Sequence, residues 1–80
     1  MNKATLLKII PNQGEISLIN HEPTIIDGRK TIVWSVYRDG RKLWVDMEED
    51  NSGWCGRFMW PFDDCSKELK QHIYKNVNNL

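Results

Sequence analysis

The chain has 80 residues, of which 40% are hydrophobic and 28% charged, with 11 basic and 11 acidic side chains. This length predicts a single domain over residues 1–80, and the zero net charge argues against a cationic surface that holds duplex DNA. No apolar run approaches a length of about 18 residues, which a transmembrane helix requires. The apolar content and its regular spacing argue against a disordered chain.

The N-terminal segment of residues 2–10 is apolar enough to form either a strand over Thr5–Ile10 or a short helix. Lys8 interrupts this apolar stretch, and a turn sequence follows it in place of the cleavage site of an export signal. We therefore expect a cytoplasmic protein, in which Cys55 and Cys65 are free thiols.

Turn-forming residues divide the chain into short segments that are rich in Ile, Val, Trp and Tyr, which favours strands. The turns are expected at residues 11–14, Asp27–Gly28, Asp39–Gly40 and Asn51–Gly53. Besides the N-terminal segment, the expected strands are Glu15–Asn20, Lys30–Arg38, Arg41–Glu48 and Trp54–Trp60.

The dipeptide Asp39–Gly40 lies between two β-prone segments, and Asp-Gly is a preferred pair for a two-residue type I′ turn. Counting outward from Arg38 opposite Arg41 then sorts the hairpin residues onto two faces. We predict that the core face carries Ile32, Trp34, Val36, Leu43, Val45 and Met47. We predict that the exposed face carries Val33, Ser35, Tyr37, Lys42, Trp44 and Asp46.

From Asp63 onward, the apolar residues recur about every four positions, and this spacing predicts an amphipathic helix. Its apolar stripe consists of Cys65, Leu69, Ile73, Val77 and Leu80. The candidate caps at its start are Asp63, Asp64 and Ser66. The predicted fold is therefore α+β, a small antiparallel β-meander of three to five strands packed against one C-terminal α-helix.

The spacing of the Cys and His residues in the sequence predicts neither a catalytic pair nor a metal site. His72 follows Cys65 by roughly 10 Å along the predicted helix, at about 1.5 Å per residue, which is too far for it to serve as base to the thiol. Zinc modules usually contain a close ligand pair, whereas Cys55 and Cys65 are far apart in the sequence, and no spacing brings His21 to them. We expect no catalytic residues, no metal site and no cofactor.

Charge is segregated along the sequence. Residues 29–42 hold five basic side chains against one acid, and residues 46–64 hold six acids against one arginine. We expect the basic and acidic residues to lie toward opposite ends of the hairpin, which would orient a charged partner.

Aromatic residues provide a second pattern, because Tyr37 and Trp44 flank Lys42 on the predicted exposed face. The tract 54–62 holds more apolar area than one side of a small sheet can bury, so it is either core or interface. Trp, Tyr and Arg are enriched in protein interfaces. We expect a small non-enzymatic binding module, a regulator or inhibitor that binds a larger protein through an aromatic and basic sheet face. The predicted partner-binding residues are Tyr37, Arg38, Arg41, Lys42, Trp44, Arg57 and Trp60.

Two alternatives remain open at this point. Aromatic residues interleaved with Arg and Lys on strands can also stack on bases, so the same face could bind nucleic acid, although the acids at 48–50 argue against this. A homodimeric structural or assembly protein, formed through the tract 54–62, is the other alternative. The sequence does not decide between monomer and homodimer.

Overall fold

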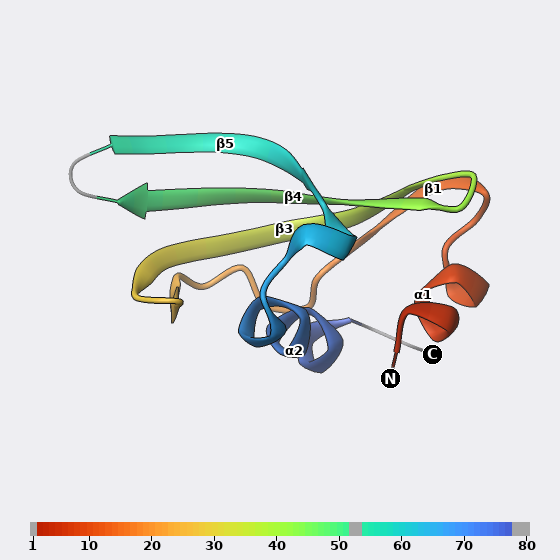
Figure 1. Cartoon of the computed structure of the whole chain (residues 1–80), viewed down its shortest axis with the longest axis horizontal. Coiled ribbons are helices and arrows are strands. Elements are labelled where there is room, and N and C mark those ends of the chain that lie inside the picture. Colours follow the sequence, from red (N-terminus) through yellow and green to blue (C-terminus); the bar gives the residue numbers. More distant parts are fainter. Residues whose placement is uncertain (1, 52–53, 78–80) are drawn as a thin grey trace.

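The computed structural model describes residues 2–51 and 54–77, without the side chains at positions 51, 54 and 55. Its elements are α1 (Lys3–Ile9), β1 (Gln13–Ser17), β2 (Thr24–Ile26), β3 (Arg29–Asp39), β4 (Lys42–Asn51), β5 (Trp54–Pro61), a 3-10 turn (Phe62–Asp64) and α2 (Lys67–Asn76). The strands form one antiparallel sheet, and the two helices lie on the same side of it (Figure 1). The predicted α+β class with a C-terminal helix is confirmed.

The sheet has the order β1–β3–β4–β5, and β2 also pairs with β3. Because β3 has 11 residues, one of its edges has room for β1 at the end near Asp39 and for β2 at the end near Arg29. The meander of β3, β4 and β5 agrees with the prediction. The three-residue strand β2 was not among the expected strands.

The strand expected over Thr5–Ile10 is wrong, and the helical alternative is confirmed. Asn2 caps α1, because its side chain accepts a hydrogen bond of 3.1 Å from the Thr5 amide. At the other end, the Arg38 guanidinium donates to the carbonyl oxygens of Leu7 and Ile10. A helix of seven residues is too short to be stable alone, so these contacts and the buried side chains of Leu6 and Ile10 hold it on the sheet.

The C-terminal helix α2 buries the predicted stripe. Its members within the described residues are all in the core, namely Cys65, Leu69, Ile73 and Val77, whereas Leu80 lies outside the described residues. Ser66 is the N-cap, and its hydroxyl accepts a hydrogen bond of 3.1 Å from the Leu69 amide. Asp63 and Asp64 belong to the preceding 3-10 turn, where Asp63 forms an ion pair of 2.7 Å with Lys3.

The two Asp-Gly dipeptides form different turns. Asp27 and Gly28 have φ values of 53° and 78°, which is the type I′ pattern, and they connect β2 to β3. Between β3 and β4, Asp39 pairs with Lys42, and of the two loop residues only Gly40 has a positive φ, at 62°, as in a type II′ turn. The predicted register around Asp39–Gly40 is therefore wrong.

The cause of this difference is strand β1. The side chain of Gln13 donates a hydrogen bond of 2.8 Å to Asp39, and the Gly40 amide donates one of 2.9 Å to the carbonyl oxygen of Asn12. These contacts hold Asp39 in the sheet, so the loop moves one residue onward and Arg38 lies opposite Leu43. The predicted turn at Asn51–Gly53 falls on residues 52–53, outside the described residues.

A β-bulge in β3 reverses the faces of half of this strand. The register between β3 and β4 shifts between Val33 and Ser35, which leaves Trp34 without a partner in β4. An extra residue changes the parity of the strand, so Val33 is buried while Ile32 and Trp34 lie on the opposite face. The prediction that Ile32 and Trp34 are core and Val33 exposed is wrong.

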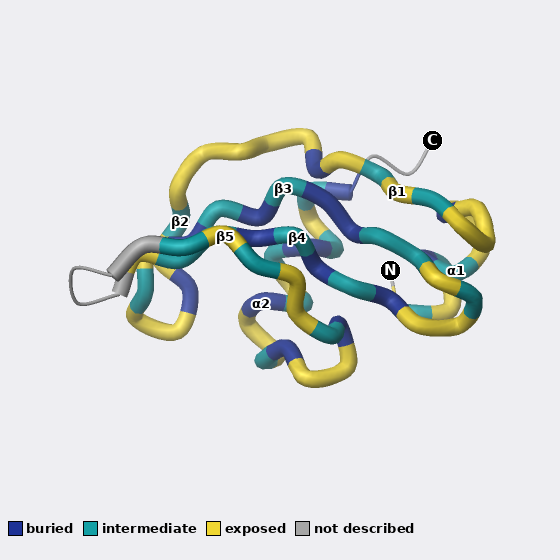
Figure 2. The backbone as a smooth tube through the Cα atoms, turned by 90° about the horizontal axis from the view of Figure 1, so that it is seen from above, coloured by how far each residue is buried: buried dark blue, intermediate teal, exposed yellow. Residues whose placement is uncertain are grey.

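We call the side of the sheet that packs on the helices the inner face, and the opposite side the outer face. The buried residues of β3 and β4 run along the middle of the sheet (Figure 2). The core consists of Leu6, Ile10, Leu18, Ile26, Val33, Val36, Leu43, Val45, Met47, Phe62, Cys65, Leu69, Ile73 and Val77. The predicted core positions Val36, Leu43, Val45 and Met47 are confirmed.

Candidate partner-binding face

The outer face carries neither helix, since both helices pack on the inner face (Figure 1). The segment after β1 covers part of it, where His21 packs against Trp34. Residues directly opposite each other on paired strands share a face, so the register assigns its members. They include Glu15, Asp39, Tyr37, Ser35, Trp34, Ile32 and Lys30 from β1 and β3, and Lys42, Trp44, Asp46, Glu48, Asp50, Arg57 and Met59 from β4 and β5. Several of these side chains are held in place by specific contacts.

Trp34, the bulge residue, is at the centre of one group of contacts. Its indole Nε1 donates a hydrogen bond of 2.9 Å to Glu48, and the Arg57 guanidinium lies 5.0 Å from its ring centroid. The His21 ring is 4.8 Å away, and His21 Nε2 lies 3.1 Å from the Trp34 carbonyl oxygen. Trp34 is therefore an ordered, half-buried side chain of the outer face.

Arg57 is held by Asp46 as well. Its Nε and NH2 groups donate to the two carboxylate oxygens of Asp46 at 3.0 and 2.8 Å. The hydrogen bond with Asp46 raises the pKa of the Arg57 guanidinium above its usual value. A bidentate pair of this kind is directional, so the guanidinium of Arg57 reaches across to β4, where the Asp46 carboxylate balances its charge.

Tyr37 and Trp44 form a cross-strand pair at the end of the sheet near the β3–β4 turn. Both side chains are half-buried, and Lys42 Nζ lies 5.2 Å from the Trp44 ring centroid. The Tyr37 hydroxyl lies 3.4 Å from Gln13 Oε1. We call Tyr37, Lys42 and Trp44 the aromatic patch.

Three of the predicted partner-binding residues, Tyr37, Lys42 and Trp44, form this patch, and Arg41 is exposed in the adjacent turn. Arg57 lies on the same face but in the group around Trp34. Arg38 and Trp60 do not join them, which corrects the prediction.

Arg38 lies on the inner face, opposite Leu43, and its guanidinium binds the end of α1. Trp60 lies opposite Val45, so it also belongs to the inner face, at the edge of the sheet, where 46% of it is exposed. Within the tract 54–62, Phe62 is core and Phe58 is half-buried, and the side chains at 54 and 55 lie outside the described residues.

The outer face is not basic. Its carboxylates are those of Glu15, Asp39, Asp46, Glu48 and Asp50. Its cations at neutral pH are those of Lys30, Lys42 and Arg57. Acids therefore outnumber Lys and Arg among the outer-face residues that the structure describes, and the predicted aromatic and basic face is corrected to an aromatic and mildly acidic one.

The predicted separation of charge along the hairpin is only partly correct, because Arg38, Arg41 and Lys42 lie near the turn but Arg29 and Lys30 lie at the acidic end. Arg29 Nε lies 2.8 Å from a carboxylate oxygen of Glu49, as an ion pair without hydrogen-bond geometry, and Lys30 lies opposite Asp50. Antiparallel pairing brings residues 29–30 to the acidic end of β4, so the two signs alternate there.

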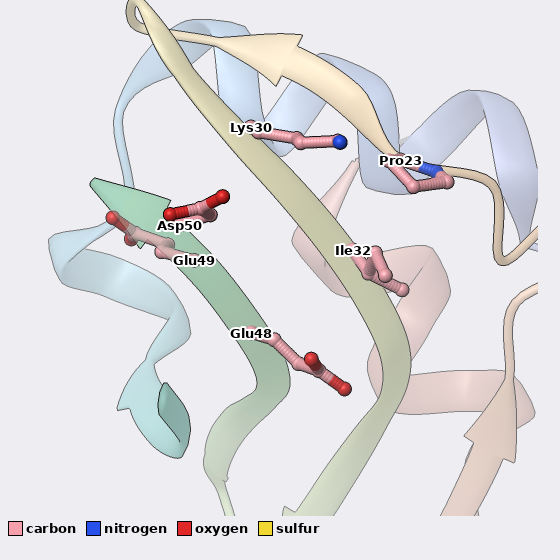
Figure 3. Close-up of a pocket in the computed structure, with 6 residues that line it drawn as sticks. All are labelled: Pro23, Lys30, Ile32, Glu48, Glu49 and Asp50. Atoms are coloured by element: carbon pink, nitrogen blue, oxygen red, sulfur yellow. The ribbon is translucent and has the colours of Figure 1, made fainter. Parts of the chain in front are cut away.

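A small pocket lies at this end of the outer face, away from the aromatic patch. It has a volume of about 210 Å³ and is lined by Pro23, Lys30, Ile32, Glu48, Glu49 and Asp50 (Figure 3). Binding sites for small molecules usually enclose about 300 to 1,000 Å³, so this pocket has room for one side chain rather than for a metabolite.

Two groups that often act in catalysis, the Cys65 thiol and the His72 imidazole, have shifted pKa values. Cys65 is buried, and burial raises the pKa of its thiol to about 11, so it is protonated at neutral pH. The pKa of His72 is lowered by burial and by the nearby Lys75. Among the side chains that the structure describes, which exclude that of Cys55, no three of His, Cys, Asp or Glu are grouped so that they could hold a metal ion.

The cluster around Trp34 was missed by sequence reasoning. The run Thr31–Val36 lacks the strict alternation of a regular strand, and this break in the period is the only signal of the bulge.

No protein-family model, curated protein sequence or solved structure matches this chain. No helix in the described part of the chain is long and apolar enough to cross a membrane.

Proposed function

We propose that this chain is a non-enzymatic protein-binding module, a regulator or inhibitor that binds a larger protein through the aromatic patch. The observation that supports this most directly is the position of Tyr37 and Trp44, two half-buried aromatic side chains paired on an uncovered sheet face. Trp and Tyr are enriched among the few residues that contribute most of the binding free energy at protein interfaces.

The aromatic patch is ordered before any partner arrives. Trp44 lies on a central strand with Lys42 above its ring, and the hydroxyl of Tyr37 is next to Gln13. Binding costs less conformational entropy when the contact side chains are already held in place. A rigid strand pair presenting two rings therefore suits the recognition of a protein surface.

The charge of the outer face favours a protein over a nucleic acid. Binding of a phosphate backbone requires cations that are free to replace counterions. Arg57 is already paired with Asp46, and carboxylates outnumber Lys and Arg on this face. The protonated, buried thiol of Cys65 likewise gives no support to catalysis, and it is compatible with the reducing cytoplasm, the location that we propose.

The proposal is tested by affinity capture from a nuclease-treated native lysate, using immobilised wild-type protein and the variants Trp44→Ala and Ile19→Ala. Ile19 is 67% exposed and lies in the segment after β1, so Ile19→Ala is the matched control. We expect proteins that the wild type and Ile19→Ala retain to be lost with Trp44→Ala, with the dissociation constant of an isolated partner rising about 30-fold. Equal capture by all three, or capture of nucleic acid alone from an untreated lysate, would contradict it.

A further inference from the structure

Strand β5 (Trp54–Pro61) is the last strand in the sheet order, and no strand in the described part of the chain pairs with its other edge (Figure 1). A free edge presents unpaired N–H and C=O groups to any second strand. Proteins usually protect such an edge with an outward lysine, a central proline or a bulge. Between Gly56 and Trp60, β5 pairs with β4 without a bulge and contains neither a lysine nor a proline. Its one charged residue there is Arg57.

The position of Pro61 shows which backbone groups face outward. Proline has no N–H, so on an edge strand it is tolerated where its nitrogen faces away from the neighbouring strand. Pro61 lies opposite Trp44 in β4. Because the direction alternates along an antiparallel strand, the N–H and C=O groups of Met59 and Arg57 face outward as well, and those of Trp60 and Phe58 face β4.

The one charge on this edge is turned away from it. The Arg57 guanidinium donates to Asp46 at 2.8 Å and lies over the Trp34 ring, so it points back across the sheet. The edge is instead flanked by apolar side chains on both faces of the sheet, since Met59 is 44% and Trp60 46% exposed. An arginine that is held in this way does not repel a second strand.

We propose that two copies of this chain pair through the free edges of β5 in antiparallel orientation, with the twofold axis at Phe58. In this register, Phe58 lies opposite Phe58 of the second copy, Arg57 opposite Met59, and Gly56 opposite Trp60. Each Arg57–Met59 pair joins outward-facing backbone groups and so exchanges both hydrogen bonds. The two sheets become one continuous sheet, and the aromatic patches stay uncovered.

The sequence around Phe58 is complementary to itself in this register. Trp60 projects from the inner face at the level where the second copy has Gly56, and an aromatic side chain across from a strand glycine covers the gap that the glycine leaves. The Phe58 and Trp60 rings already contact each other edge to face, with centroids 6.3 Å apart, so the pairing would extend this cluster across the axis. The cluster borders an open groove of about 340 Å³, which is lined by Phe58 and Trp60 of β5 and by Leu69 of α2.

The neighbouring registers are poorer. An axis at Arg57 would place the two arginines opposite each other, which destabilises a strand pair. An axis at Met59 would place Arg57 opposite Pro61, which cannot donate a hydrogen bond. With 11 basic and 11 acidic residues, two copies also carry no net charge that would keep them apart.

The proposal is tested by sedimentation equilibrium over a wide range of protein concentration, together with backbone amide hydrogen exchange. We expect the average mass to rise toward that of a dimer. The amides of Arg57 and Met59 should exchange slowly only at high concentration, whereas those of Phe58 and Trp60 should be protected at every concentration. A monomeric mass throughout the range would overturn the proposal.

The variant Met59→Pro distinguishes this interface from any other. It removes an outward N–H without removing a hydrogen bond to β4, so we expect a folded monomer with an unchanged circular dichroism spectrum. Met59→Lys should also be monomeric, and Ile19→Lys, which adds the same charge at an exposed site outside β5, should dimerise like the wild type. If Met59→Pro and Met59→Lys both dimerise as the wild type does, self-pairing through β5 is wrong.

Discussion

The two faces of the sheet are built on different principles. The inner face carries aliphatic side chains such as Val36 and Val45, which are fully buried beneath the helices. The outer face carries Trp34, which is positioned by a hydrogen bond to Glu48 and by the Arg57 guanidinium. Burial of apolar area stabilises the first, whereas directional contacts order the second. Substitutions should therefore affect stability on the inner face and binding on the outer face.

The largest effect is expected for Ile73→Ala. Ile73 is a fully buried residue of α2, and its truncation leaves a cavity in the layer between helix and sheet. We expect the free energy of unfolding to fall by about 3 kcal/mol. Urea denaturation measures this, with Gln71→Ala on the exposed side of the same helix as control. If the two variants are equally stable, α2 does not cover the inner face as described.

The next effect depends on pH and involves Cys65, which belongs to the same buried layer. Burial raises the pKa of its thiol from 9.0 to about 11, so the folded state prefers the protonated thiol more strongly than the unfolded chain does. This contribution to stability, about 2 kcal/mol, is complete at pH below the unfolded pKa and is lost as pH rises through the folded one.

The Cys65 effect is measured as the difference in unfolding free energy between Cys55→Ser and the double variant Cys55→Ser/Cys65→Ala. We expect this difference to shrink by about 2 kcal/mol between about pH 8 and about pH 11. A difference that does not change with pH would show that the Cys65 thiol has the same pKa in the folded and unfolded states, as expected for an exposed thiol.

Arg38→Met sharpens the comparison, because Arg38 is an inner-face cation that sequence reasoning assigned to partner binding. Its guanidinium binds the carbonyl oxygens of Leu7 and Ile10, so removing it leaves the end of α1 without donors. We expect a loss of about 1.5 kcal/mol in stability, with capture of protein partners unchanged. Arg41→Met, in the exposed turn, is the control and should change stability by less than about 0.5 kcal/mol. Loss of partner capture without loss of stability would reverse this assignment.

The smallest effect on stability is expected for Trp44→Ala. Trp44 is half-buried on the outer face, so its removal opens no enclosed cavity, and we expect a loss of about 1 kcal/mol or less. Val45→Ala, the next residue of the same strand but fully buried, should cost about 2 kcal/mol despite its smaller change in size. Thermal unfolding of both variants measures which of them loses more stability. A larger loss for Trp44→Ala than for Val45→Ala would mean that the outer face is packed as tightly as the core.

Much of the fold could be predicted from local patterns. The helix α2 followed from a four-residue apolar spacing, and the faces of β4 followed from alternation. The faces of β4 were correct even though the register was wrong. Between Ser35 and Asp39 the observed register differs by two residues, which is one full period of strand alternation, and the bulge beyond them lies in β3 and leaves β4 regular. The candidate site was predictable to the same extent, since Tyr37, Lys42 and Trp44 depend on alternation near the turn.

The sequence by itself determined the elements whose signal is local, namely the amphipathic helix, the alternating strand and the positions at which the chain turns. Only the tertiary structure decided which of two Asp-Gly dipeptides forms the type I′ turn, where β3 inserts an extra residue, and that Arg38 binds a helix. The physical reason is that these features depend on contacts with strands and helices distant in the sequence. Asp39 is held by Gln13, and Arg38 by Leu7 and Ile10.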